Sequence, residues 1–143
     1  MFLVCIIGAS KDDFDSRRSK SPPLVGTKWQ LIAFVDVEND TSVPPKSPPN
    51  FPVKFWISFL KNNEINGGGC NKYYGMHSIN FDAKELSISI HAITEINCVE
   101  FDEELFLNSL EEVQSFDWIK EKTNTLLLYY NDGKNYLKLK EKK

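Results

Sequence analysis

The sequence predicts an α+β domain in which antiparallel strands form a strongly curved or barrel-like sheet, with one amphipathic helix at about residues 101–114. Two observations predict this class. Short segments rich in strand-forming residues, bounded by turn residues, recur along residues 27–140. One segment alone changes to a helical period, and it lies among the strands, so antiparallel pairing is expected rather than helical crossovers. The 143 residues, of which 41% are hydrophobic and 13% aromatic, suit a single domain with a real core.

The first half of the chain contains two clear strand signals separated by a loop. Residues 27–36 begin with alternation and are rich in strand formers, and in residues 53–60 every second side chain is apolar. Residues 37–52 contain five prolines, which exclude a central strand and predict a long surface loop. Asn62 and Asn63 then predict a turn into a short strand over residues 64–67.

The second half predicts a hairpin, a helix and three further strands. Residues 73–80 and 85–91 form the hairpin. The helix follows from the spacing of Leu105, Phe106, Leu110 and Val113, and Asp102 is expected to cap it. The last strands are predicted over residues 115–120, 125–130 and 135–140, with a tight turn at residues 131–134.

The N-terminal region divides into residues 1–10, an apolar leader, and residues 11–23, whose charges, serines and prolines predict a disordered tether; the folded domain spans residues 24–143. The leader has two interpretations. It is the end of a partial signal or lipoprotein anchor with Cys5 as the lipid-attachment residue, or it is an apolar first strand. Val4 stands where lipoprotein signals usually carry a small residue, which opposes the first interpretation, while the tether supports it. We expect a cell-envelope protein, lipid-anchored, periplasmic or secreted.

The charge balance argues against a polyanion-binding protein. The formal net charge is −3, from 17 basic and 20 acidic residues, so nucleic acid is not an expected partner. Five lysines lie between Lys134 and Lys143, and a short basic end of this kind is usually solvated. No run of eighteen apolar residues exists to span a membrane as a helix.

Cys70 and Cys98 are the main candidate site. Three glycines precede Cys70, which indicates a backbone that approaches another segment closely or needs positive φ. We interpret the two cysteines as a disulfide. Two free buried thiols remain an alternative, and a metal site is weaker because neither His77 nor His91 stands at a zinc-ligand spacing from a cysteine. A bridge closing about 28 residues would stabilise the domain by roughly 3.6 kcal/mol and would indicate an oxidising compartment.

A possible binding surface consists of Asn71, Tyr73, Tyr74 and Trp56. The simpler interpretation has Asn71 bonding neighbouring backbone amides in a turn, with the tryptophan filling the core. Lone strand histidines are usually packed or solvated. The glycine triplet lacks the lysine and helix of a phosphate-binding loop, and no triad or paired-carboxylate pattern is present. We therefore expect no catalytic residue, no metal and no cofactor.

An ordered set of short motifs then resembles a known family. The set begins with Gly-Thr-Lys-Trp-Gln-Leu at residues 26–31, continues with Gly-Cys-Asn at 69–71 and Tyr-Gly at 74–75, and includes Thr94 four residues before Cys98. It resembles the META domain, also called HslJ-like, over residues 24–140. The resemblance implies a small α+β domain in a bacterial envelope lipoprotein or secreted protein, linked to heat shock, antibiotic resistance or virulence. No catalytic activity is established for the family, so it supplies no catalytic residue.

Three functions are compatible with these features. The first is a non-enzymatic, monomeric envelope protein, possessing a stress or resistance role, that binds another envelope component. The second is a small-molecule binding module at the mouth of the curved sheet, near Tyr73, Tyr74 and Trp56. The third is a protease-inhibitor-like module that presents the loop of residues 37–52.

Overall fold

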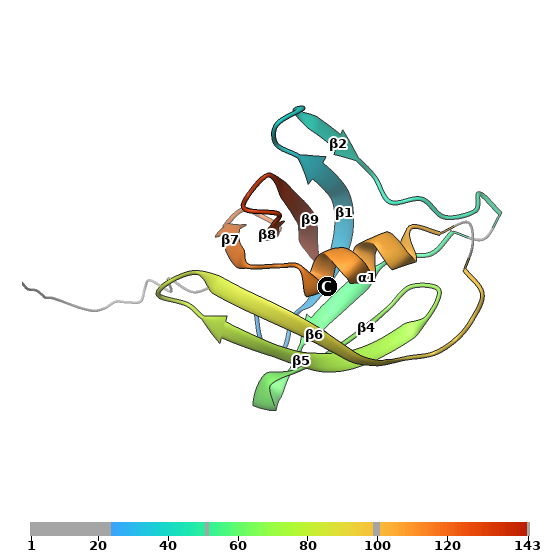
Figure 1. The fold of residues 1–143 in the computed structure, drawn as a ribbon, viewed down its shortest axis with the longest axis horizontal. Helices are drawn as coiled ribbons and strands as arrows, with labels where there is room; N and C mark the ends of the chain where they lie inside the picture. Colours follow the sequence, from blue (N-terminus) through green and yellow to red (C-terminus); the bar gives the residue numbers. More distant parts are fainter. Residues whose placement is uncertain (1–23, 51, 99–100, 143) are drawn as a thin grey trace, which may run out of the picture.

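The computed structural model describes residues 24–50, 52–98 and 101–142. The leader, the tether and Cys5 lie outside these residues. Nine antiparallel strands form one sheet in the order β2-β1-β3-β4-β5-β6-β7-β8-β9, and β1 also pairs with β9, so that the sheet closes into a ring (Figure 1). One α-helix accompanies them in the described residues. The expected α+β class, with a strongly curved antiparallel sheet and one helix, is therefore confirmed, although the ring is not a barrel.

The strands follow the alternation of the sequence. Their bounds are β1 Lys28–Asp36, β2 Thr41–Val43, β3 Trp56–Phe59, β4 Glu64–Gly68, β5 Lys72–Asn80, β6 Glu85–Ile93, β7 Ser115–Ile119, β8 Thr125–Tyr130 and β9 Asn135–Lys142. A short 3₁₀ turn at Lys61–Asn63 joins β3 to β4, and Asn62 and Asn63 adopt positive φ there. Asparagine tolerates this region better than most residues, which explains the turn.

The loop predicted over residues 37–52 contains one short strand, β2, which sequence analysis did not anticipate. It pairs with β1 through Phe34↔Val43 and Asp36↔Thr41. All three β2 residues are exposed, so no buried face leaves an alternating signal. The turn before β2 is held by Asp36, whose carboxylate accepts hydrogen bonds from the backbone and side chain of Asn39, at 3.2 and 2.8 Å. These bonds lower the pKa of Asp36 below its usual value.

Helix α1 spans Glu103–Glu111, shorter at both ends than the expected 101–114. Phe106, Leu110 and Val113 are buried as predicted, while Leu105 is exposed. The expected side-chain cap by Asp102 is wrong. Its carboxylate instead accepts a 2.8 Å hydrogen bond from the backbone of Lys46, and its own backbone N–H donates to the Lys46 carbonyl at 3.0 Å. Asp102 therefore ties the proline-rich loop to the start of the helix.

The core lies inside the ring of strands and against α1. Its buried apolar members are Leu24, Trp29, Leu31, Phe55, Ile57, Phe59, Ile65, Tyr73, Leu86, Ile88, Phe106, Leu110, Val113, Phe116, Leu126, Leu128, Leu137 and Leu139. Side chains from both ends of the described chain thus share one hydrophobic cluster. Strands β6 and β7 pair only at Glu85↔Ser115 and diverge beyond that pair, so the ring is open there. Beyond that point α1 lies beside β6, and Glu111 accepts a 3.0 Å hydrogen bond from the Ile90 backbone.

None of the helices in the described residues has the length and apolar character needed to cross a membrane.

Candidate functional site: the pocket beside the disulfide

The structure joins Cys70, just before β5, to Cys98, in the segment that leads from β6 towards α1. Their Cα atoms lie 6.2 Å apart across a sequence separation of 28 residues. The predicted disulfide is therefore present in the structure. It fits a location outside the cytosol, where disulfides persist.

The glycine triplet provides close approach rather than positive φ. A Cβ added at Gly68 would lie 2.6 Å from Nε1 of Trp56, because the indole covers that glycine on the outer face of the sheet. Tyr73 covers Gly67 in the same way on the inner face. A Cβ at Gly69 would lie 2.5 Å from Phe55 and 2.8 Å from Oε1 of Glu103. Each glycine is required because another side chain occupies the space that its own would fill.

Asn71 joins three segments of the chain through its buried side chain. Its Oδ1 accepts hydrogen bonds from the Thr94 hydroxyl and the Ile96 backbone N–H, both at 2.7 Å. Its Nδ2 donates to the Ile96 carbonyl at 3.1 Å, to the Cys98 sulfur at 3.0 Å and to Glu103 at 2.7 Å. The partners are distant in sequence, so the expectation of a local turn is wrong. Asn71 fixes β5, the segment of residues 94–98 and the start of α1 to one another.

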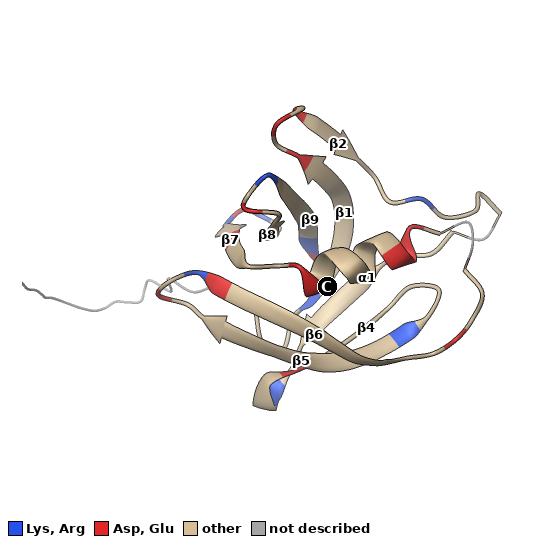
Figure 2. Ribbon diagram, in the orientation of Figure 1, with Lys and Arg blue, Asp and Glu red and all other residues tan. Residues whose placement is uncertain are grey.

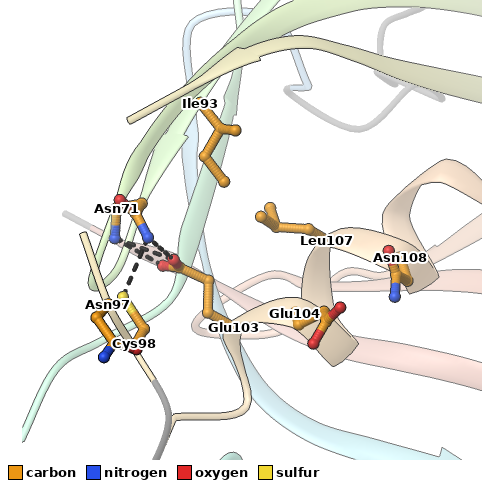
Figure 3. A pocket seen from close by; sticks show the side chains of 8 residues that line it. All are labelled: Asn71, Ile93, Asn97, Cys98, Glu103, Glu104, Leu107 and Asn108. Atoms are coloured by element: carbon orange, nitrogen blue, oxygen red, sulfur yellow. Dashed lines mark hydrogen bonds between the residues drawn. The ribbon is translucent and has the colours of Figure 1, made fainter. Parts of the chain in front are cut away.

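Glu103 is the site residue that sequence reasoning missed. Its side chain is only 4% exposed, and its Oε1 accepts a 2.8 Å hydrogen bond from the backbone of Asn71. Nδ2 of Asn71 donates a second hydrogen bond to the same carboxylate, so both the backbone and the side chain of Asn71 bind Glu103 (Figure 3). Its sequence context, two glutamates in a helical first turn, indicates only a favourable interaction with the helix dipole, and nothing marks it as buried.

Tyr73 lies in the core and is 0% exposed, so it is not part of a binding surface. Its hydroxyl donates a 2.8 Å hydrogen bond to the Trp56 carbonyl. Burial, and secondarily the negative charge of Glu103, raise the pKa of Tyr73 well above its usual value, so its hydroxyl stays protonated. Tyr74, by contrast, is 54% exposed, and Trp56 is half-buried on the same outer face. The four proposed residues therefore do not line one cavity.

The two histidines have the ordinary roles expected for them. His77 is buried, packs edge-on against Phe59 with 5.1 Å between ring centres, and places Nδ1 3.2 Å from the Glu64 carbonyl. Burial lowers its pKa below the usual value, although the bond to Glu64 opposes this shift. His91 is exposed and contacts Ser89 at 3.1 Å. His91 therefore lies within hydrogen-bond distance of a hydroxyl, but no carboxylate of the described residues orients its ring, as a catalytic triad would require.

The Asn71–Glu103 pair forms the floor of a pocket of about 320 Å³ between α1, the end of β6 and the disulfide (Figure 3). The residues that line this disulfide pocket are Asn71, Ile93, Asn97, Cys98, Glu103, Glu104, Leu107 and Asn108. Ile93 and Leu107 give it apolar walls, while Asn97, Glu104 and Asn108 are exposed at its rim. Both ends of α1 carry acidic residues in Figure 2, and no lysine or arginine of the described residues lines the pocket.

The cysteines and Glu103 also bear on metal binding. The two sulfurs and a Glu103 oxygen lie within 4.8 Å of one another. Because the sulfurs are joined in the bridge, they are not thiolate ligands in this structure. The residues as they stand do not fit a zinc site, which needs deprotonated cysteines.

The fold and the pocket define a small disulfide-linked α+β domain with a ring-like antiparallel sheet. The META domain family model matches residues 22–143, and this chain belongs to that family. No curated protein matches the sequence.

Two solved structures share the fold. One, a DUF4847 family protein from Bacteroides vulgatus, has a TM-score of 0.61 and 14% identity, covering 82% of this chain and 94% of the other. The other, a protein from Burkholderia xenovorans, has a TM-score of 0.65 and 17% identity, covering 92% and 99%. At these identities the likeness shows the fold alone.

Proposed function

We propose that this META-domain protein is a non-enzymatic binding protein of the cell envelope, with a role in stress or resistance, and that its disulfide pocket receives a basic group of another envelope component. The observation that carries the proposal is the arrangement of Asn71 and Glu103. Both are buried, bonded to each other and fixed beside the disulfide, at the floor of a pocket that opens to solvent. A floor held in this way is preorganised for binding.

The chemistry of the pocket supports binding rather than catalysis. Both polar atoms of the Asn71 side chain are already bonded within the protein, and the Cys98 sulfur is held in the bridge. Among the described residues, the pocket lining contains no histidine, serine, threonine or lysine, and the carboxylate of Glu103 already accepts hydrogen bonds from Asn71. Tyr73, the nearest group of strongly shifted pKa, is buried behind the sheet and bonded to the backbone.

The lining also indicates the kind of group bound. Glu103 and Glu104 contribute carboxylates, and Asn97 and Asn108 contribute side-chain amides that have no hydrogen-bond partner within the described residues, while Ile93 and Leu107 are apolar. A volume of about 320 Å³ lies at the small end of ligand pockets, which span roughly 300–1,000 Å³. It suits one lysine or arginine side chain of a partner protein, whose stem would contact the apolar walls and whose charge would meet the carboxylates.

Two alternatives are less well supported. The interior of the ring is filled with core side chains, and Tyr73 belongs to that core, so a small-molecule site at the mouth of the sheet lacks its expected lining. The loop of residues 37–52 pairs with β1 through β2 and is bonded to Asp102 through Lys46. A protease-inhibitor role through this loop is therefore not favoured.

The proposal can be tested by titrating the full-length protein with N-acetyl-arginine methylamide and observing backbone NMR shifts. We expect the largest shifts at Asn97, Asn108 and Ile93, which line the pocket. Glu104→Gln should weaken the interaction, whereas Glu85→Gln, a matched charge change at an exposed residue of β6 outside the pocket, should not. Equal effects of the two substitutions, or shifts spread evenly over the surface, would contradict the proposed pocket. Crosslinking from Asn108 in envelope extract would then identify the partner.

A further inference from the structure

The outer face of the sheet carries a second pocket, of about 230 Å³, on the side of β1, β3 and β9. We call it the Trp56–lysine pocket, and its lining residues are Lys28, Gln30, Lys54, Trp56 and Lys142. It shares no lining residue with the disulfide pocket. Of the lysines near the end of the chain, for which the sequence suggests a solvated tail, Lys142 of β9 lines this pocket.

Strand register forces like charges together at this place. Lys28 of β1 lies directly opposite Lys142 of β9, and Lys140 lies opposite Gln30 in the next pair on the same face. Like charges directly opposite each other on a sheet are destabilising. Lys28 finds partial compensation because its ammonium lies 4.0 Å from the centre of the Trp56 ring, a cation–π contact.

No carboxylate among the described residues forms an ion pair with Lys28, Lys54 or Lys142. Glu141, which neighbours Lys142, instead accepts hydrogen bonds from Asn124 at 3.2 and 3.4 Å. The positive charges of the pocket are therefore not neutralised by the part of the protein that the structure describes.

The side chains of the pocket are almost entirely hydrogen-bond donors. They supply three ammonium groups and the Gln30 amide, whose oxygen is the one side-chain acceptor among these five residues. Neither the indole N–H nor the Gln30 amide has a hydrogen-bond partner in the described residues. Such a lining favours a ligand rich in acceptors and negative charge. The indole adds a flat apolar wall, held over Gly68 because that residue has no side chain.

We propose that the Trp56–lysine pocket binds an anionic saccharide: the Lys28 ammonium leaves the indole ring to join Lys54 and Lys142 around a phosphate, sulfate or carboxylate group, and a sugar ring takes its place against the indole. At about 230 Å³ the pocket lies below the usual range of ligand pockets, so it suits a single sugar unit at most rather than a long polyanion. A nucleic-acid site would need a longer basic track, and the net charge of −3 opposes it. This site is separate from the one in the proposed function and would bring a second class of envelope component to the same domain.

Calorimetric titration of the full-length protein at low ionic strength tests the proposal with four probes: glucose 6-phosphate, glucose, inorganic phosphate and polygalacturonate. We expect glucose 6-phosphate or polygalacturonate to bind, glucose not to bind, and phosphate to bind about tenfold more weakly than the anionic sugar because it lacks the ring. Binding of the sugar phosphate alone identifies a free sugar as the ligand, and binding of the polymer alone identifies a polysaccharide. Added salt should weaken either interaction.

The decisive variant replaces Lys28, Lys54 and Lys142 by glutamine. It should lose about tenfold or more in affinity, because each removed ammonium takes away a charge-assisted contact. Its unfolding midpoint without ligand should not fall, since the opposed pair Lys28↔Lys142 is relieved, and this separates lost binding from lost folding.

The matched control replaces three exposed lysines elsewhere, Lys61, Lys122 and Lys134, by glutamine and carries the same change in net charge. Trp56→Leu should weaken binding of the sugar phosphate but not of inorganic phosphate. Equal affinities in the two triple variants would overturn the proposal. Binding only to phosphatidylglycerol vesicles, or a sugar phosphate that binds no better than inorganic phosphate, would overturn it too.

Discussion

Replacing Asn71 by aspartate exchanges one NH₂ group for an oxygen and leaves the shape of the side chain unchanged. In the native protein that NH₂ group lies 2.7 Å from Oε2 of Glu103. In the variant two buried carboxyl groups meet at this distance, and they cannot both be ionised. The pair will retain one proton, as closely spaced carboxyl pairs do. The substitution therefore replaces a stabilising hydrogen bond by a pair of carboxyl groups whose effect on the free energy of unfolding depends on pH.

The destabilisation caused by Asn71→Asp can be calculated from the cost of keeping one carboxyl group of the pair protonated. Keeping a carboxyl with an ordinary pKa of about 4 protonated at pH 7 costs about 4 kcal/mol, at roughly 1.4 kcal/mol per pH unit. At pH 5 this cost falls to about 1.4 kcal/mol. Because the pKa of the pair is raised in the folded state, the destabilisation is present above the unfolded pKa and diminishes as pH falls. Lost donation to Ile96 and Cys98 adds about 1 kcal/mol each, independent of pH.

Urea denaturation of the oxidised protein at pH 5 and pH 7 measures both quantities. Asn97→Asp is the matched control, because Asn97 lines the same pocket but is exposed, and it should change the free energy of unfolding by less than about 0.5 kcal/mol. Asn71→Ala should destabilise by about 3–5 kcal/mol with a smaller pH dependence than Asn71→Asp, since it removes one hydrogen bond from the Glu103 carboxylate without placing a second carboxyl beside it. If Asn71→Asp matched Asn97→Asp in midpoint, or had the pH slope of the native protein, the buried pair would not exist as described.

Three further predictions concern stability. Cys98→Ser should lower the free energy of unfolding by about 2–4 kcal/mol in urea denaturation, and an identical midpoint for the native protein with and without reductant would argue against the bridge. Gly69→Ala should cost about 1–3 kcal/mol through its contact with Glu103 and Phe55, measured by thermal unfolding. Gly133→Ala, at φ +82 with nothing within 4 Å, should cost about 1–2 kcal/mol from backbone strain alone, and a Gly69→Ala protein as stable as the native one would contradict the packing argument. The pKa of His77 is lowered on folding, so the free energy of unfolding should decline as pH falls below about 6.5. His77→Phe should remove this decline, whereas His91→Gln should leave it. An unchanged dependence of stability on pH in His77→Phe would show that His77 is not its cause.

Much of the fold could be predicted from the sequence because the strands bury one face. Residues such as Leu86, Ile88, Leu137 and Leu139 alternate with polar neighbours and are all buried. Strand β2 has no buried face, so only its pairing with β1 reveals it. Ring closure also depends on pairing between distant strands, which local periodicity does not encode.

The candidate site was only partly predictable. The glycine triplet and the two cysteines indicated a close, covalently held approach, which the structure contains. Glu103 could not be recognised because its burial depends on Asn71, 32 residues away. The burial of Tyr73 could not be predicted, because strand alternation leaves open which face is inside until the neighbouring strand is known.

Pairing of β1 with β9 has a consequence for biogenesis. The first strand remains without its principal neighbour until the last eight residues of the sheet, Asn135–Lys142, have been synthesised. A growing chain therefore cannot complete its hydrogen-bonded circle during translation, and such long-range closure slows folding. A chain shortened before Asn135 would present the bare edge of β1 to other molecules and would be prone to aggregate.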